Sequence, residues 1–397
     1  MVPLRCAPLR GGIVPPVIGP MRIGIVCYPT FGGSGVVATE LGIALAEKGH
    51  TVHFITYDRP VRLRDVEGRV FYHEVRVSDY PLFDYPPYEL VLSSKLVDVA
   101  ENEGLDLVHV HYAIPHASAA WMAQQILASR GRRLPFITTL HGTDITLVGR
   151  DPSFEPVITF SIERSDGVTA VSESLRKDTY KHFPVKRDID VIPNFVCIDQ
   201  YPQQPDPVIR KRYAPNGELL LVHTSNFRPV KRVEDVVSVF QKVREHLPVR
   251  LLMIGDGPER QLVETHCRQH GACSDVLFLG KITRPEDVLG SCDLFLLTSE
   301  SESFGLAALE AMACGVPVVS TDTGGTPEVN THGVSGLLSP VGDVDRMAAN
   351  AITILQDAQS RARFRQGALA RAAEFDVAKV LPRYEALYAD VMKNSKG

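Results

Sequence analysis

The stretch of this chain that decides its fold is residues 294–319, LFLLTSESESFGLAALEAMACGVPVV. An apolar strand is followed by a polar turn that contains glycine, a helix-forming run and, after Gly315, a second apolar strand. Free backbone N–H groups and the helix dipole make the turn at residues 303–306 a candidate anion site. Glu310, inside the helix, can accept hydrogen bonds from sugar hydroxyls, so the stretch favours a sugar nucleotide. The alternative is an ordinary helix whose Glu310 faces solvent.

The same alternation of strand and helix begins at Met21 and restarts after a polar, proline-rich segment at residues 200–217. Apolar runs that are separated by amphipathic helices predict parallel sheets covered on both faces. The predicted strands are 22–28, 51–57, 105–112, 135–140, 167–171 and 189–192, then 219–222, 250–254, 276–279, 293–297 and 316–320. The predicted fold class is therefore α/β, with two doubly wound, Rossmann-like domains.

We place these domains at residues 21–198 and 199–375. Ligands of doubly wound sheets bind at the carboxyl ends of the strands, so two such halves predict a cleft lined by the loops that follow the strands. Residues 376–397 contain a last helix. Residues 1–20 are rich in proline and glycine, and we expect them to be a disordered leader outside the fold.

Size and composition exclude several classes of protein. A chain of 397 residues is too long for one ordinary core, and its 44% hydrophobic and 22% charged residues are typical of globular proteins. The net charge of -5 argues against nucleic acid as a partner. Residues 1–20 have no apolar stretch long enough for a membrane span or a signal peptide. Seven cysteines without a Cys-x-x-Cys pair indicate neither a zinc site nor a disulfide framework, so we expect a cytoplasmic protein.

A glycine-rich loop follows the first predicted strand. In Gly32-Gly33-Ser34-Gly35 the backbone can approach a diphosphate or a sugar closely, and Ser34 offers a hydroxyl at the floor of the cleft. A simple tight turn is the alternative, and the spacing does not match the dinucleotide fingerprint G-x-G-x-x-G.

Histidines gather at the ends of two later strands. His109, His111 and His116 lie close together, but no carboxylate or cysteine nearby completes a metal-ligand set, so we interpret them as hydrogen-bonding residues. His141 ends the next strand, directly before a glycine. The polar residues after it, Thr143 and Asp144, can cap the following helix.

A basic run follows the first strand of the second half. Lys231 lies at a strand-to-helix junction, where its charge can offset the negative charge of a diphosphate. The usual alternative for such a run is a solvated surface.

Glu302 and Glu310 stand eight positions apart. With Phe304-Gly305-Leu306 and the tail CGVPVV they resemble the E-x7-E motif of retaining glycosyltransferases with the GT-B fold, family 4. The resemblance implies two Rossmann-like domains that face a cleft, and a C-terminal helix, here within residues 376–397, that packs back on the first domain.

The resemblance also implies roles for the candidate residues. The diphosphate is expected to contact Lys231, Gly33 and the backbone N–H groups of Ser303, Phe304, Gly305 and Leu306. Glu310 would bind the ribose and Glu302 the transferred sugar. Many relatives carry an arginine five positions before the lysine; here Asn226 occupies that place, and Arg228 lies between the two as a further donor-binding residue. His141 resembles the family histidine that meets the transferred sugar, so the expected catalytic residues are His141, Glu302 and Lys231.

The family retains the configuration of the sugar, with a diphosphate oxygen taking the proton of the acceptor, so no side-chain base is needed. Glycosidase chemistry would require a second catalytic acid, which has no candidate here. The two Asp-x-Asp matches, at Asp188-Ile189-Asp190 and Asp343-Val344-Asp345, are interpreted as solvated turn acids. We therefore predict a metal-independent enzyme without a cofactor.

Longer runs point to one subfamily. CYPTFGGSG at 27–35, HYAIPHA at 111–117, TTLHGTDIT at 138–146 and SNFR at 225–228 are similar to family members that transfer N-acetylglucosamine from UDP-N-acetylglucosamine to L-malate in bacillithiol biosynthesis. The acceptor is then expected to contact Ser34, Tyr112, Thr139 and His141. Relatives often carry a basic residue where Gly167 stands, so Arg164 or Arg150 is the candidate cation for the acceptor.

Other functions stay open. One is transfer to another small anionic acceptor of the inositol phosphate type, and another is a UDP-N-acetylglucosamine 2-epimerase, which shares the two-domain fold but uses no acceptor. A non-catalytic sugar-nucleotide-binding protein is disfavoured because both Glu302 and Glu310 are present. The sequence leaves the oligomeric state open, a homodimer included.

Overall fold

The computed structural model describes residues 19–30, 32–77, 85–147, 149, 151–269 and 274–395. They divide into two compact units. The N-terminal unit comprises the described residues up to Asn194 and those from Ala378 onward, and the C-terminal unit comprises Phe195–Val377. Most of the expected leader lies outside the described residues, as does Arg150.

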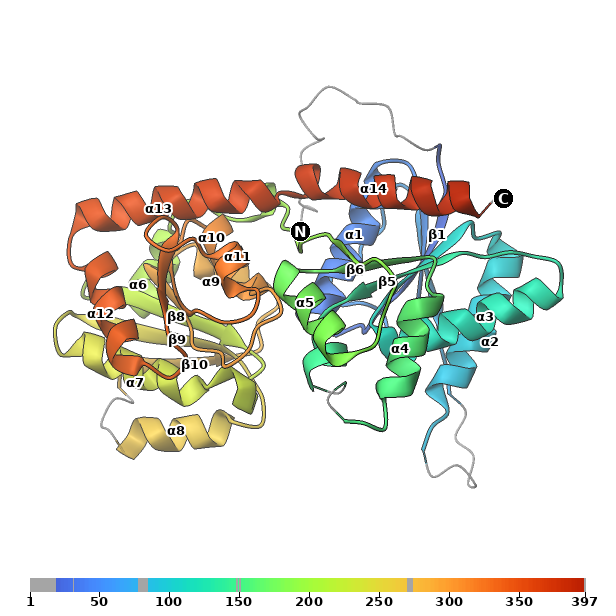
Figure 1. The fold of residues 1–397 in the computed structure, drawn as a ribbon. Coiled ribbons are helices and arrows are strands. Elements are labelled where there is room, and N and C mark those ends of the chain that lie inside the picture. Colours follow the sequence, from blue (N-terminus) through green and yellow to red (C-terminus); the bar gives the residue numbers. More distant parts are fainter. Residues whose placement is uncertain are drawn as a thin grey trace. The chain divides into compact units, whose positions relative to one another are not determined.

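A seven-stranded parallel sheet forms the centre of the N-terminal unit (Figure 1). Its strands are β1 (Arg22–Val26), β2 (Thr51–Thr56), β3 (Val70–Glu74), β4 (Leu107–His111), β5 (Phe136–Leu140), β6 (Gly167–Ala170) and β7 (Asp190–Val191). They are ordered β3-β2-β1-β4-β5-β6-β7, so the direction of winding reverses between β1 and β4. The central strands β4, β5 and β6 are buried throughout, including their histidines and threonines, as expected for a parallel sheet that is covered on both faces.

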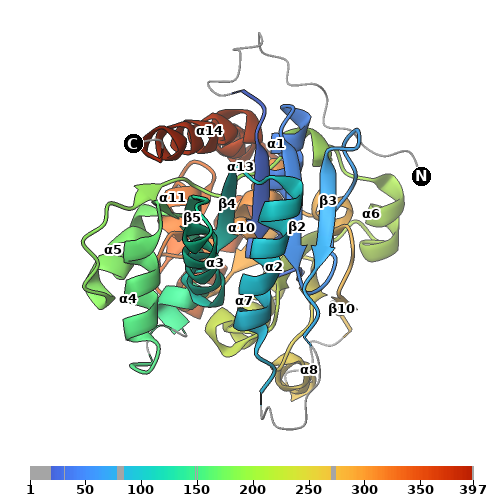
Figure 2. The ribbon, with the colours of Figure 1, turned by 90° about the vertical axis from the view of Figure 1, so that its right-hand side faces the viewer.

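Helices connect these strands and cover the sheet. They are α1 (Gly33–Glu47), α2 (Tyr88–Glu103), α3 (Ser118–Ser129), α4 (Glu155–Arg164), α5 (Glu173–His182) and α14 (Val377–Asn394). Figure 2 shows α2 and α3 side by side in front of the sheet. Leu96 of α2 and Ala119 of α3 belong to one apolar core with Val108 of β4, which fixes the position of the loop after β4.

The C-terminal unit repeats this design around a six-stranded parallel sheet. Its strands are β8 (Leu219–Ser225), β9 (Val249–Gly255), β10 (Val276–Gly280), β11 (Leu294–Leu297), β12 (Val318–Thr321) and β13 (Gly336–Ser339). The order is β10-β9-β8-β11-β12-β13, so the reversal lies between β8 and β11.

The helices of this unit are α6 (Pro207–Tyr213), α7 (Val233–Arg244), α8 (Arg260–Gln269), α9 (Pro285–Leu289), α10 (Leu306–Ala313), α11 (Thr326–Val329), α12 (Val344–Leu355) and α13 (Ala358–Ala372). In α7 the apolar residues Val233, Val236, Val237 and Phe240 recur at helical spacing, and all are buried in the core with Leu251 of β9.

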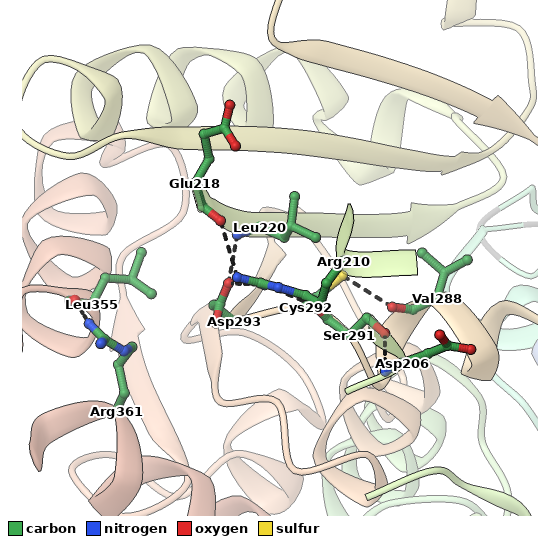
Figure 3. Close-up of polar contacts among 10 residues, drawn as sticks. All are labelled: Asp206, Arg210, Glu218, Leu220, Val288, Ser291, Cys292, Asp293, Leu355 and Arg361. Atoms are coloured by element: carbon green, nitrogen blue, oxygen red, sulfur yellow. Dashed lines mark hydrogen bonds and ion pairs between the residues drawn. The ribbon is translucent and has the colours of Figure 1, made fainter. Parts of the chain in front are cut away.

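An ion pair fixes the entry to the C-terminal unit (Figure 3). Arg210 of α6 donates to Oδ2 of Asp293 at 2.6 Å and to the carbonyl oxygen of Ser291 at 3.0 Å. The same Asp293 oxygen accepts from the backbone N–H of Leu220 at 2.7 Å. Asp293 directly precedes β11 and Leu220 lies near the start of β8, so these contacts hold the amino ends of the strands, at the sheet edge opposite the candidate binding loops.

The last helix, α14, packs on the N-terminal sheet. Tyr384 and Tyr388 are fully buried. A Cβ atom placed at Gly167 would lie 3.1 Å from Cγ2 of Val391 and 3.3 Å from Cδ1 of Leu387. Gly167 is therefore a packing position beneath α14.

Some details differ from the predictions. The strands β3 and β13 were not predicted. Cys27, Cys267, Cys292 and Cys314 are free and buried. Among the described residues, no helix has both the length and the apolar character needed to cross a membrane.

Candidate active site in two halves

The N-terminal half of the site lies where the winding of the first sheet reverses, between β1 and β4. Gly33 is the first residue of α1, and the next residue, Ser34, accepts a hydrogen bond from the hydroxyl of Tyr112 at 2.7 Å. This bond joins the loop after β1 to the loop after β4. In a doubly wound sheet this is the position where a ligand is expected.

Close backbone packing shapes the glycine-rich loop. A Cβ atom at Gly35 would lie only 2.3 Å from the carbonyl oxygen of Tyr28 and 2.9 Å from that of Thr30. Only glycine permits this approach, so the loop is more constrained than a simple tight turn.

Tyr112 holds an unusual backbone conformation directly after β4. Its φ of 89° is rare for a residue with a side chain. Its N–H donates to the carbonyl oxygen of Thr139 at 2.9 Å, and its ring lies 5.2 Å from the ring of Tyr28, between centroids. Strained backbone that is held in this way is frequent at functional sites.

Three histidine rings form a stack beneath the loops. His109 and His111 alternate along β4 on one face of the sheet, with ring centroids 4.6 Å apart, and His141 follows at 5.0 Å from His111. The Nδ1 atom of His111 lies 2.7 Å from Nε2 of His141. His109 contacts the hydroxyls of Tyr388 and Thr139, each at 2.7 Å. These histidines therefore make hydrogen bonds, as the sequence led us to expect.

Burial keeps these rings neutral near pH 7. It lowers the pKa of His109 and of His141 to about 3 and that of His116 to about 4. The pKa of His111 is also lowered well below its ordinary value, first by burial and then by the neighbouring rings.

Asp144 ties the loops after β4 and β5 together. Its carboxylate accepts from the backbone N–H of Gly142 at 3.0 Å and from that of Ala113 at 2.9 Å. Burial raises the pKa of Asp144 to about 6, against the lowering effect of these N–H groups. The sequence suggested only a helix cap here, because the contact with Ala113 spans 31 residues and leaves no local signal.

Two predicted acceptor contacts have different surroundings. The hydroxyl of Thr139 is buried and lies 2.7 Å from both His109 Nε2 and Thr169 Oγ1, so it is engaged inside the unit. Arg164 is exposed over the ring of Phe160 at the end of α4, just before β6. It therefore lies at the amino edge of the sheet and is not brought together with Ser34, Tyr112 and His141.

The C-terminal half lies at the reversal between β8 and β11. Nζ of Lys231 donates to Oε1 of Glu302 at 2.5 Å, and the hydroxyl of Ser299 donates to the same oxygen at 2.8 Å. Thr298 donates to the carbonyl oxygen of Lys231 at 2.9 Å. The predicted diphosphate contact and the predicted sugar contact are therefore direct neighbours. Among the described residues Nζ of Lys231 makes this one hydrogen bond, so its other protons can contact a ligand.

The glycine-containing turn at residues 303–306 leads into α10. Gly305, with φ of 95°, is the N-cap residue, and Leu306 is the first residue of the helix. Glu310 is only 9% exposed, and its carboxylate accepts from the hydroxyl of Tyr201 at 3.3 Å. Glu310 is thus not the solvent-facing residue of the alternative interpretation.

The loop with Glu302 rests on a tightly packed turn. A Cβ atom at Gly324 would lie 2.0 Å from the carbonyl oxygen of Glu302, and Gly325 donates its N–H to that oxygen at 2.8 Å. Asn226 and Arg228, the other predicted donor contacts, are exposed in the loop after β8. Ser303 and the buried Phe304 complete the turn.

One of the two Asp-x-Asp pairs has structural contacts, and the other lies at the start of β7. Asp343 accepts from the N–H of Arg346 as the cap of α12, and Asp345 pairs with Lys242 at 2.8 Å. Asp188 is exposed, and Asp190 begins β7. Within the described ranges, no cluster of three or more His, Cys, Asp or Glu residues is arranged to hold a metal ion.

Comparison with known families defines the class. The family "Glycosyltransferase Family 4" matches residues 31–200, and "Glycosyl transferases group 1" matches residues 206–371. The chain belongs to glycosyltransferase family 4, and its two doubly wound domains form the GT-B fold. It is therefore a glycosyltransferase.

One relative has a much higher sequence identity to this chain than membership of the family alone would imply. The chain is 46% identical to the N-acetyl-alpha-D-glucosaminyl L-malate synthase of Bacillus anthracis over 95% of this chain and 98% of the relative. A D-inositol 3-phosphate glycosyltransferase of Thermobispora bispora is 26% identical over 91% and 90% of the two chains.

Solved structures share the fold. Sucrose-phosphate synthase from Thermosynechococcus elongatus has a TM-score of 0.76 at 21% identity and covers 94% of this chain and 100% of its own. Anabaena HepE in complex with UDP and glucose has a TM-score of 0.77 at 20% identity, with 93% and 100% coverage.

Proposed function

We propose that this glycosyltransferase transfers N-acetylglucosamine from UDP-N-acetylglucosamine to the hydroxyl of L-malate, with retention of configuration, as the first step of bacillithiol biosynthesis. The observation that carries the proposal is the 46% identity to the malate synthase across nearly the whole chain. The arrangement of Ser34, Tyr112 and His141 at the reversal of the first sheet supports it, because a hydroxylated dicarboxylate needs hydrogen-bond donors.

In this mechanism the C-terminal half binds the donor. Lys231 contacts the diphosphate and stabilises the charge that develops on the leaving group, together with the N–H groups at the start of α10. Glu302 binds the sugar and Glu310 the ribose. Because Lys231 already contacts Glu302 at 2.5 Å, one side chain can align the leaving group and the sugar at once.

The proposed reaction needs neither a metal ion nor a cofactor. The charge of the diphosphate is offset by Lys231 and by Arg228 in the same loop, where the neutral amide of Asn226 can donate a hydrogen bond. The carboxylates of the Asp-x-Asp pairs that could have bound a metal have other partners or are exposed. We infer a cytoplasmic enzyme, since the donor is a cytoplasmic metabolite. A homodimer is the proposed oligomeric state, because twofold dimers are the commonest homo-oligomers. Light scattering of the purified protein tests it.

The test is release of UDP from UDP-N-acetylglucosamine by the purified protein in EDTA, with and without L-malate. Malate-dependent release in the chelator is the expected result, and the anomeric coupling of the product in a proton NMR spectrum reports retention. Tyr112→Phe should raise the KM for malate. Arg164→Ala, at the opposite edge of the sheet, is its matched control and should keep the wild-type KM for malate.

Other outcomes would overturn the proposal. Turnover with inositol 3-phosphate but not with malate would change the acceptor. Formation of the 2-epimer without any acceptor would replace transfer by epimerisation. Loss of turnover in EDTA that returns with a divalent ion would contradict metal independence.

A further inference from the structure

The side chain of His141 makes one hydrogen bond to the described residues, and its two ring nitrogens differ. Nε2 lies 2.7 Å from Nδ1 of His111. Nδ1 of His141 makes no hydrogen bond to the described residues and is not enclosed, as the side chain keeps 8% of its surface exposed. His141 therefore has an inward nitrogen and an outward one.

The contact between the two rings can hold one proton only. Burial lowers the pKa of both rings, so each is neutral near pH 7 and carries one N–H. Either His111 donates from Nδ1 to Nε2 of His141, or His141 donates from Nε2 to Nδ1 of His111. The choice decides whether the outward nitrogen of His141, Nδ1, carries a proton or a lone pair.

The surroundings of His111 decide between these arrangements. Its Nε2 is buried and has no hydrogen-bond partner among the described residues. If His141 were the donor, the single proton of His111 would sit on this enclosed nitrogen as an N–H without an acceptor, which is rare in folded proteins. If His111 is the donor, its N–H is satisfied and the enclosed nitrogen keeps only a lone pair.

A ring of His111 turned over by half a turn would place Cδ2 where Nδ1 lies, 2.7 Å from Nε2 of His141, which is too short for a contact between carbon and nitrogen. His116 donates from Nδ1 to the carbonyl oxygen of His111 and so fixes the backbone there. The imidazole is enclosed between the rings of His109 and His141, at 4.6 Å and 5.0 Å between centroids. His111 is fully buried.

We propose that His111 is a positioning residue that fixes His141 as the Nδ1–H tautomer, so that His141 presents a neutral hydrogen-bond donor to a hydroxyl oxygen of the bound sugar. The sugar contact of His141 rests on the proposed function, whereas the tautomer does not. In this state both nitrogens of His141 are committed, one lone pair to His111 and one proton to the ligand. His141 then has no lone pair with which to deprotonate the acceptor, and the base must be another group.

The first test is the tautomer itself, in the protein without substrate. The protein is labelled with nitrogen-15 in histidine, and long-range proton–nitrogen correlation distinguishes protonated from unprotonated ring nitrogens. Loss of one ring system in His141→Asn assigns the signals. We expect a protonated Nδ1 and an unprotonated Nε2 in His141; the reverse pattern overturns the proposal, whatever the acceptor of the enzyme is.

The second test uses two substitutions at one position. The amide of Asn in His111→Asn can still donate near the former Nδ1, whereas His111→Leu cannot donate. We expect His111→Leu to lower kcat/KM about three- to tenfold, the effect of one neutral hydrogen bond, and His111→Asn to restore most of it. Equal losses in both folded variants, or no loss in either, would refute the positioning role, while any turnover at all leaves the transferase assignment intact.

Discussion

Mild acid should destabilise the N-terminal unit through its buried histidines. His109, His111, His116 and His141 all have a pKa that is lowered from 6.5 on folding, mainly by burial. When the pKa of a histidine is lower in the folded state than in the unfolded state, the protein keeps its full stability at pH values above the unfolded-state pKa. As the pH falls from there toward the folded-state pKa, protons bind the unfolded state first and stability is lost. The sensitive range is therefore below pH 6.5.

The magnitude follows from proton linkage. A group that titrates near 6.5 when unfolded and stays neutral when folded loses about 1 kcal/mol of stability between about pH 6.5 and 5.5. Four such groups lose about 4 kcal/mol, and His53 on β2, whose pKa is lowered to about 4 by burial, adds about 1 kcal/mol. Asp144 acts in the opposite sense, because its pKa is raised to about 6 and its protonation favours the folded state as the pH falls. It offsets roughly 1 kcal/mol, which leaves a net loss of about 4 kcal/mol.

The sole tryptophan allows the loss of unfolding free energy to be measured for the N-terminal unit alone. Trp121 lies on α3, with its ring 4.7 Å from that of Phe160 between centroids, so its fluorescence follows the unfolding of the N-terminal unit. Urea titrations at several pH values give the free energy of unfolding at each. His109→Gln should reduce the loss by about 1 kcal/mol, and His182→Gln, at an exposed position of α5, is the matched control. A free energy of unfolding that is constant or rises below pH 6.5 would refute the reasoning.

Three further predictions concern single contacts. Lys231→Ala should lower kcat about a hundredfold or more while circular dichroism stays unchanged, because the leaving group loses its counter-charge; a tenfold or smaller effect would remove Lys231 from the mechanism. Gly35→Ala should cost about 1–3 kcal/mol in urea denaturation, since its Cβ meets the carbonyl oxygen of Tyr28; wild-type stability would contradict that packing. Arg210→Ala should destabilise the C-terminal unit by about 1–3 kcal/mol, as followed by circular dichroism, because Asp293 loses its partner, whereas Arg212→Ala should change it little; equal effects would show that the ion pair contributes nothing.

The sheets were predictable where strands are buried on both faces. The run of β11, LFLL, is entirely apolar, and its burial throughout is the physical reason. β4 and β5 are also buried throughout, although they carry His109, His111, Thr138 and Thr139 among their apolar residues. The strand β3 lies at an edge of its sheet and is only partly buried, so its sequence, VFYHE, carries no such run. The four-residue β13 is similarly too short to be distinguished from a loop.

The candidate site was predictable to the level of loops but not of side chains. Parallel strands bring the loops after β1 and β4 to one edge, which is why Ser34 and Tyr112 could be grouped before their hydrogen bond was known. The direction of each side chain was not encoded in this pattern, so Thr139 was assigned to the acceptor although its hydroxyl is bound inside. The position of Arg164 could have been found from topology, since a helix that precedes a strand ends at the amino edge of the sheet.

The last helix makes the N-terminal half of the site depend on the end of the chain. The hydroxyl of Tyr388 in α14 lies 2.7 Å from His109, which is 279 residues earlier, and the other nitrogen of His109 contacts Thr139. Without α14 this buried nitrogen would lose its partner, at a cost of about 1–3 kcal/mol, and the apolar face around Gly167 would be uncovered. The first sheet therefore cannot complete its core until the C-terminal unit has been synthesised. We therefore expect residues 19–194, which contain every strand of their sheet, to be less stable alone than together with α14.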